Sequence, residues 1–195
     1  MSSALNRLSP AEYLEQDRAA ATRSEYYFGE VIAMSGGTES HNLIGSNINR
    51  QAGNALEQRP CRVYTSDMRI RTLTGVYTYP DVSIVCGQPQ LADERKDILL
   101  NPLVIFEVLS PSTALYDRGA KFDHYRSIPS LQTYVIVAQD HPSIDCYSRQ
   151  PNAGGWLLTV ARGLNAVIQI PAANFELSLS RVYANVEFPA QEVPK

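Results

Sequence analysis

Hydrophobic residues form two nearly continuous runs, at residues 103–109 and 133–137, and each run predicts a strand that is buried on both faces. The first run reads Leu-Val-Ile-Phe-Glu-Val-Leu, and one carboxylate, Glu107, interrupts it. A carboxylate inside a buried strand costs free energy unless it is paired, hydrogen-bonded or bound to a cation. Glu107 is therefore the first residue that the pattern sets apart.

Two helices are predicted before these strands. The stretch Ser9-Pro10-Ala11-Glu12 forms a capping box with proline at the first helical position, so a short helix is expected from about Pro10. A second helix is expected from His41 to about Glu57, with Ser40 as its cap. Its apolar positions recur at helical spacing and are Ile44, Ile48, Ala52 and Ala55.

A third helix is predicted directly after the strand that carries Glu107. The stretch from Ser110 to Thr113 supplies hydroxyl caps and a proline for its start. On other faces of this helix, Leu115 and Phe122 are expected to pack on the sheet. Spacings of three or four define one polar face, which holds Asp117, Lys121, His124 and Tyr125.

Short apolar or alternating runs predict the remaining strands. A hairpin is expected with its turn at Gly29-Glu30. Three further strands are expected over residues 62–65, 68–71 and 79–85. A closing antiparallel meander is expected over residues 144–147, 156–160 and 167–170. Because no repeat or linker divides the chain, we interpret residues 1–195 as a single domain of the α/β class, an α+β arrangement with a mixed sheet.

Composition and charge narrow the classes of function. The chain has 195 residues, of which 44% are hydrophobic, so we expect a substantial core rather than disorder. The formal net charge is −3, which excludes a global positive field, and any contact with nucleic acid must come from a local patch. The N-terminal residues lack an apolar signal core, and no apolar stretch is long enough to cross a membrane. We therefore expect a cytoplasmic protein with no membrane partner.

The three cysteines, Cys61, Cys86 and Cys146, are odd in number and far apart. Their spacing matches neither a metal site nor a disulfide framework. We therefore expect three reduced, buried thiols.

Two carboxylates and a lysine are the candidates for chemistry. Tyr79-Pro80-Asp81 places a carboxylate at the start of an apolar strand, and Glu107 lies late in another. If these strands pair, both carboxylates can meet at one edge of the sheet. Two acidic oxygens and a backbone carbonyl, such as that of Val108, suit Mg²⁺. Lys121 could orient or deprotonate a water and stabilise phosphoryl charge, which would support hydrolysis of a phosphodiester.

Each of these residues also has an interpretation without chemistry. Asp81 could simply satisfy an amide at the strand end, and Lys121 could only pair with Asp117 at i, i+4. His41 is interpreted as a helix-start residue. Glu30 is interpreted as a turn residue, which reaches a site only if its hairpin folds over it. A charged outer strand face is expected for Arg69 and Arg71.

At these residues the chain resembles a known family. The Uma-type endonucleases are similar to it in the stretches YPDVSIV, LVIFEVLSPST, DRGAKFDHYRSIPSLQTYVIV and YYFGEVIAMSGGTESHNLIGSNI. They belong to the restriction-endonuclease-like superfamily, named for its Pro-Asp…(Asp/Glu)-X-Lys motif. The resemblance extends from about Tyr26 to Val137. It implies a mixed sheet flanked by helices, metal-dependent nuclease activity and a homodimer.

By position, the resemblance makes Asp81 the motif aspartate and Glu107 the second acidic residue, both expected to hold Mg²⁺ or Mn²⁺. Two residues after Glu107, where many of these nucleases have lysine, the chain has Leu109. In Uma-type proteins the lysine lies on the following helix, and here that position is Lys121. Two functions stay open: an endonuclease that hydrolyses DNA with these three residues, and a catalytically silent module that keeps the fold for assembly with a partner.

Overall fold

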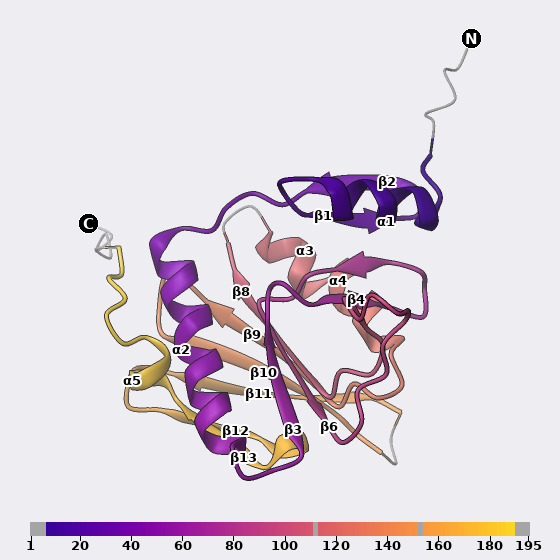
Figure 1. Ribbon diagram of the computed structural model, residues 1–195. Coiled ribbons are helices and arrows are strands. Elements are labelled where there is room, and N and C mark those ends of the chain that lie inside the picture. Colours follow the sequence, from indigo (N-terminus) through magenta and orange to yellow (C-terminus); the bar gives the residue numbers. More distant parts are fainter. Residues whose placement is uncertain (1–6, 111–112, 152–153, 190–195) are drawn as a thin grey trace.

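The computed structural model of the chain describes residues 7–110, 113–151 and 154–189. Its main layer is a six-stranded sheet of β3 (Cys61–Thr65), β6 (Val82–Cys86), β8 (Val104–Leu109), β9 (Thr133–Ala138), β10 (Ser143–Arg149) and β11 (Trp156–Arg162). The order across the sheet is β11-β10-β9-β8-β6-β3 (Figure 1). β8 and β9 are parallel and the other neighbours are antiparallel, which confirms the predicted mixed sheet.

The two apolar runs form the middle of this sheet. Every residue of β8 and β9 is buried, as expected for strands covered on both faces. One of these faces is covered by α2 (Glu39–Leu56). The N-cap of α2 is Thr38, so the predicted cap at Ser40 was two residues late, and Ala55 is exposed. The helix packs on the sheet with residues three or four apart, which are Ile44, Ile48, Ala52 and Leu56.

The C-terminal elements cover the same face as α2. They are β12 (Val167–Ile170), the 3-10 turn η1 (Pro171–Ala173), β13 (Phe175–Ser178) and α5 (Leu179–Val182). β12 pairs with β13 in a separate two-stranded sheet, so the predicted meander was wrong for its third strand. β11 is therefore left as an edge strand of the main sheet.

Two short helices, α3 (Ala114–Arg118) and α4 (Ala120–Arg126), lie on the opposite face, where one helix was predicted. The helix is interrupted between them at Gly119, whose backbone is not helical, with φ −117° and ψ −104°. Phe122 is buried as expected, but Leu115 is 89% exposed, because the break ends the register that would place both residues on the sheet. Pro111 and Ser112 of the predicted cap lie outside the described residues. Within the described ranges, no helix combines the length and apolar character needed to span a bilayer.

A second sheet of five strands lies beside the first, in the order β2-β1-β5-β4-β7. Its strands are β1 (Ser24–Tyr27), β2 (Glu30–Ala33), β4 (Arg69–Arg71), β5 (Tyr77–Thr78) and β7 (Ile98–Leu99). The predicted capping box is present in α1 (Pro10–Ala19), which packs on this sheet and lies with the β1–β2 hairpin in Figure 1. The hairpin turn falls on Phe28 and Gly29, with φ 49° and 100°, one residue earlier than predicted, because this tight turn needs two positive φ angles.

Arg69 is buried instead of lying on a charged outer face. Its Nη2 is 2.6 Å from Oδ2 of Asp17, and the two side chains are 3% and 1% exposed. The hydroxyl of Tyr79 donates to the same carboxylate at 2.6 Å. A buried guanidinium requires such partners, and this ion pair ties α1 to the second sheet. Arg71 is exposed, as expected.

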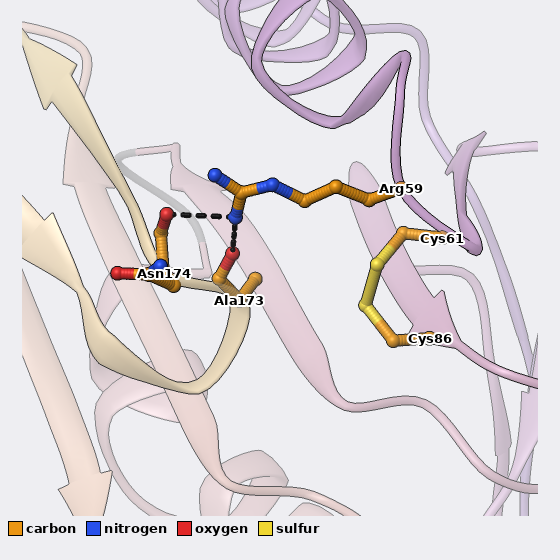
Figure 2. Close-up of a disulfide and its surroundings, with 5 residues drawn as sticks. All are labelled: Arg59, Cys61, Cys86, Ala173 and Asn174. Carbon is orange, nitrogen blue, oxygen red and sulfur yellow. Dashed lines mark hydrogen bonds between the residues drawn. A yellow bond between two sulfur atoms is a disulfide. The ribbon is translucent and has the colours of Figure 1, made fainter.

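The prediction of three reduced thiols was wrong for two of them. Cys61 and Cys86 face each other in the β3–β6 ladder and form a disulfide, with Cα atoms 4.0 Å apart (Figure 2). Directly opposed residues on antiparallel strands have close Cβ atoms, so the bond depends on a register that cysteine spacing does not reveal. Cys146 is free and buried. Because disulfides are typical of oxidising compartments, the cytoplasmic location stays a prediction.

Arg59 lies next to this disulfide (Figure 2). Its Nη1 donates to the carbonyl oxygens of Ala173 at 2.7 Å and Asn174 at 2.8 Å. The segment before β3 is thereby joined to η1, while the disulfide joins β3 to β6.

Candidate active site

Asp81 and Glu107 lie on neighbouring strands at the same end of the main sheet. β6 and β8 pair with Val82 opposite Phe106, and one further step of this register sets Asp81 opposite Glu107. Oδ2 of Asp81 accepts a hydrogen bond of 2.7 Å from the Val108 amide. This is the strand-end role that the sequence left open, and it occupies one of the two carboxylate oxygens.

Glu107 is a buried carboxyl group, 4% exposed, that is held from the second sheet and from α4. Its Oε1 accepts a hydrogen bond of 2.7 Å from the Tyr125 hydroxyl. That hydroxyl also lies 2.8 Å from Oγ1 of Thr78 on β5. Tyr125 thus orients the carboxylate of Glu107 from the helix that also carries Lys121.

Lys121 reaches from α4 to this carboxyl group. Its Nζ lies 3.0 Å from Oε1 of Glu107 and 3.6 Å from Oδ1 of Asp117, so the i, i+4 partner is the more distant one. A third carboxylate is also in contact, because Oε1 of Glu25 lies 3.2 Å from Nζ. Burial alone lowers the pKa of Lys121, but the charges of Glu107 and its other anionic neighbours outweigh burial and raise this pKa well above its usual value. The side chain is therefore an ammonium ion.

The buried cluster around Lys121 has more negative than positive charge. Three carboxyl groups, of Glu25, Glu107 and Asp117, surround one ammonium group. Burial and the neighbouring carboxylates together raise the pKa of Glu107 and that of Asp117, although Lys121 opposes both shifts. The cluster therefore favours uptake of one positive charge, either a proton or a cation.

Glu25 is a site residue that the sequence-based interpretation missed. That interpretation considered Glu30, which is exposed at the start of β2, whereas Glu25 on β1 is 9% exposed and faces Lys121. A signal was available, since Glu25 is followed by two tyrosines in a short strand. The rule that singled out Glu107, a carboxylate among buried strand residues, applies to Glu25 as well.

His41 lies beside Asp81, with its Nε2 3.4 Å from Oδ2 of that carboxylate. Although burial lowers the pKa of His41, hydrogen bonding to Asp81 and to the Val108 backbone raises it above its ordinary value. His41 is thus both the predicted helix-start residue and a neighbour of the site. His124 is not part of the site, because its Nδ1 lies 3.0 Å from Oγ1 of Thr74.

A cavity of about 600 Å³ opens beside Asp81 and His41. It lies between α2 and the end of β3, and its lining is rich in hydroxyl and amide groups. Among the described residues, the lining carries one arginine or lysine side chain, that of Arg23. Asp81 is therefore open to solvent from this side.

The donor groups fit a small, hard divalent cation. Asp81 and Glu107 supply carboxylate oxygens on the same end of the sheet, and the surplus negative charge around Glu107 favours a cation. In the part of the chain that the structure describes, no cluster of three or more acidic, histidine or cysteine side chains is arranged as a complete metal cage. Mg²⁺ does not require one, because it keeps several waters and is usually bound by one or two carboxylates.

Comparisons with known proteins lead to one family and its relatives. Residues 10–181 match the model of the family Uma2, described as a putative restriction endonuclease. The uncharacterized protein sll1609 of Synechocystis is 35% identical over 163 residues, which cover 83% of this chain and 92% of that protein. A second uncharacterized Synechocystis protein, slr1290, is 37% identical over 153 residues, which cover 78% of this chain and 79% of that protein.

A solved structure has the same fold. It is described as a putative nuclease belonging to DUF820 from Anabaena variabilis, and it superimposes with a TM-score of 0.74 at 20% sequence identity. The superposition covers 91% of this chain and 98% of that one. The mixed sheet with its flanking helices is thereby found again in a crystal structure.

Proposed function

Because the chain belongs to the Uma2 family of putative restriction endonucleases, which are restriction-endonuclease-like nucleases, we propose that it is a metal-dependent endonuclease that hydrolyses phosphodiester bonds in DNA. The observation that carries the proposal is the contact of the Lys121 ammonium group with Glu107, at 3.0 Å. Glu107 lies on β8, and the neighbouring strand, β6, begins directly after Asp81. Two carboxylates and an ammonium group at one sheet end are the parts that phosphodiester hydrolysis requires. Residues 1–195 form a single domain in this proposal.

Each of the three side chains has a role in the proposed reaction. Asp81 and Glu107 hold Mg²⁺ or Mn²⁺, which when bound supplies Lewis-acid polarisation of a phosphoryl oxygen and lowers the pKa of a bound water. Lys121 stabilises the negative charge that develops on the phosphoryl group. Its raised pKa supports this role over that of a general base, because an ammonium ion has no free electron pair to accept a proton.

DNA as the substrate is supported by the cavity beside Asp81. Hydroxyl and amide groups, which commonly contact phosphate and sugar, line it together with Arg23. The low positive charge of this lining agrees with the net charge of −3 and favours weak binding with a small dependence on salt, because few phosphates are neutralised.

Lys121→Ala tests the proposal. The variant is expected to lose cleavage of plasmid DNA by about 10²-fold or more in Mg²⁺ or Mn²⁺, because charge stabilisation in the transition state is lost. Its affinity for Mn²⁺ should be retained, since the lysine is not a ligand. Arg126→Ala, on the exposed side of the same helix, is the matched control and should cleave as the unmodified protein does.

A catalytically silent module for assembly is the second candidate function. The observation that favours it is that Asp81 and Lys121 both have protein partners already, the Val108 amide and three carboxyl groups. Equal cleavage by Lys121→Ala and the unmodified protein would contradict the assigned role of the lysine. Absence of cleavage by both proteins on supercoiled, linear and single-stranded DNA would favour the silent module.

We further propose that the chain forms a homodimer through the free edge of β11. Leu157, Leu158 and Val160 on this strand are 55%, 46% and 41% exposed, and an apolar edge strand is prone to pair with another chain. Sedimentation at micromolar concentration should show a dimer, and Leu158→Glu should convert it to a monomer. Leu115→Glu, at an exposed leucine of α3, is the control. A monomer before any substitution would contradict the proposal.

A further inference from the structure

The ammonium group of Lys121 joins the two sheets of the protein. Its Nζ contacts Oε1 of Glu107 on the six-stranded sheet at 3.0 Å and Oε1 of Glu25 on the five-stranded sheet at 3.2 Å. The side chains of Lys121, Glu107 and Glu25 are 8%, 5% and 11% exposed. Water therefore competes little for either contact.

Glu25 is held firmly where it meets the lysine. Its Oε2 accepts a hydrogen bond of 2.6 Å from the Tyr27 hydroxyl, and its Oε1 accepts one of 3.3 Å from the Tyr79 amide. Tyr79 precedes Asp81 by two residues, so the same backbone segment that positions Glu25 leads into the proposed metal ligand. The location of Glu25 is fixed from β1 and from the approach to β6.

A cation bound by Asp81 and Glu107 would lie close to the positively charged Lys121. Oε1 of Glu107 already accepts from Tyr125 and contacts Lys121. A divalent cation on the same carboxylate repels the ammonium group, and this repulsion is strong in a buried site. The ammonium group then needs another anionic partner, because a buried charge without one is costly.

We propose that Glu25 is a positioning residue, which retains the Lys121 ammonium group when a divalent cation takes Glu107. This inference rests on the proposed function, since it requires a cation at that carboxylate. Asp117 contributes in the same sense from 3.6 Å, but it lies on α3, which directly precedes the helix of Lys121, and it is the more distant partner. Glu25 acts through Lys121 and is not a ligand of the cation.

Measurements of cation binding can distinguish a positioning role of Glu25 from a general electrostatic effect of its charge. If Glu25 merely adds negative charge near the site, its neutralisation weakens cation binding whether or not the lysine is present. If Glu25 acts by withdrawing the lysine from Glu107, its neutralisation weakens cation binding only while the lysine is present. A double-mutant cycle separates the two cases.

The experiment is a titration of the full chain with Mn²⁺, followed by electron paramagnetic resonance of the free ion. Glu25→Gln should raise the dissociation constant about tenfold, a magnitude typical of coupling between sites. In a Lys121→Met background, Glu25→Gln should change it by less than about twofold by the same argument. Glu30→Gln, in the exposed part of the same hairpin, is the control and should match the unmodified protein.

A second variant covers the case in which Lys121→Met does not fold. Glu25→Asp keeps the charge but shortens the side chain by one methylene group, so it loses the contact with Nζ. It should weaken Mn²⁺ binding about as much as Glu25→Gln does, whereas a general electrostatic effect predicts no change.

Equal weakening by Glu25→Gln in both lysine backgrounds would overturn the inference and leave the proposed function standing. Mn²⁺ binding by Glu25→Asp equal to that of the unmodified protein would do the same. An unmodified protein that binds Mn²⁺ no better than Asp81→Asn would overturn the metal site of the proposed function, and this inference with it.

Discussion

Glu107→Gln is expected to abolish cation binding and DNA cleavage while leaving the protein folded and, near neutral pH, more stable than the unmodified protein. The amide has nearly the same shape as the carboxyl group but cannot supply an anionic ligand. Lys121 keeps Glu25 and Asp117 as partners, so the substitution does not leave an unpaired buried charge. The free energy of unfolding should rise, because one buried charge that its carboxylate neighbours repel is removed.

The pH dependence of this gain follows from the pKa of Glu107. Burial, with the charges of Asp117, Asp81 and Glu25, raises this pKa in the folded protein, although Lys121 opposes the shift. A carboxyl group whose pKa is raised on folding contributes stability below its unfolded pKa, and that contribution is lost as the pH rises through the folded pKa. Glu107→Gln has no carboxyl group at this position and does not lose this stability. The difference in free energy of unfolding between the variant and the unmodified protein should therefore be absent near pH 4 and grow as the pH rises.

Urea denaturation in the presence of a chelator, at several pH values, measures this difference, and Mn²⁺ titration measures the loss of the site. Glu94→Gln, at an exposed position in the loop before β7, is the matched control for removal of a negative charge. Retained Mn²⁺ affinity in Glu107→Gln would contradict the assignment of this residue as a ligand. Lower stability of the variant at every pH would contradict the picture of a surplus of buried negative charge.

Replacement of both Cys61 and Cys86 by serine is expected to lower the free energy of unfolding by about 3 kcal/mol. The disulfide closes a loop with a sequence separation of 25 residues, and the restriction it places on the unfolded chain gives this magnitude. A loss of this size lowers the folding equilibrium constant about a hundredfold. The loop contains β4, β5 and Asp81, so its closure also limits the positions available to one proposed ligand.

The measurement is urea denaturation with and without a thiol reductant. The unmodified protein should lose stability when the reductant is added, and the double variant should show no response, which makes the reductant an internal control. Coincident denaturation curves for the two proteins without reductant would show that the cross-link contributes nothing to stability.

Local patterns in the sequence were sufficient for the centre of the fold. Continuous apolar runs identified β8 and β9, and a capping box identified α1, because these signals lie within a few consecutive residues. Features that depend on register were missed. The disulfide requires Cys61 opposite Cys86, and the assignment of residues 69–71 to a second sheet requires a parallel partner, β7, that follows almost thirty residues later.

In the candidate site, too, local patterns predicted some residues, whereas contacts between distant segments were missed. Glu107 stood out because its buried strand made the charge conspicuous. Asp81 and Lys121 were candidates from their places at a strand start and on the next helix, and the family resemblance assigned their motif roles. Helical spacing placed Tyr125 on the polar face of its helix but could not give its partners, because its hydroxyl is shared by Glu107 of β8 and Thr78 of β5. Glu25 comes from a hairpin that the main sheet does not include, so no spacing rule connects it with Lys121.

The contact of Glu25 with Lys121 also constrains the order in which the molecule can fold during synthesis. Lys121 leaves the ribosome about a hundred residues after Glu25, which at typical translation rates is a delay on the order of 5 to 20 seconds. During this interval the β1–β2 hairpin has neither its lysine nor the later strands of its sheet, and an isolated two-stranded hairpin is marginally stable at best. Glu25, the first residue of the cluster to be synthesised, is therefore among the last to reach its final position.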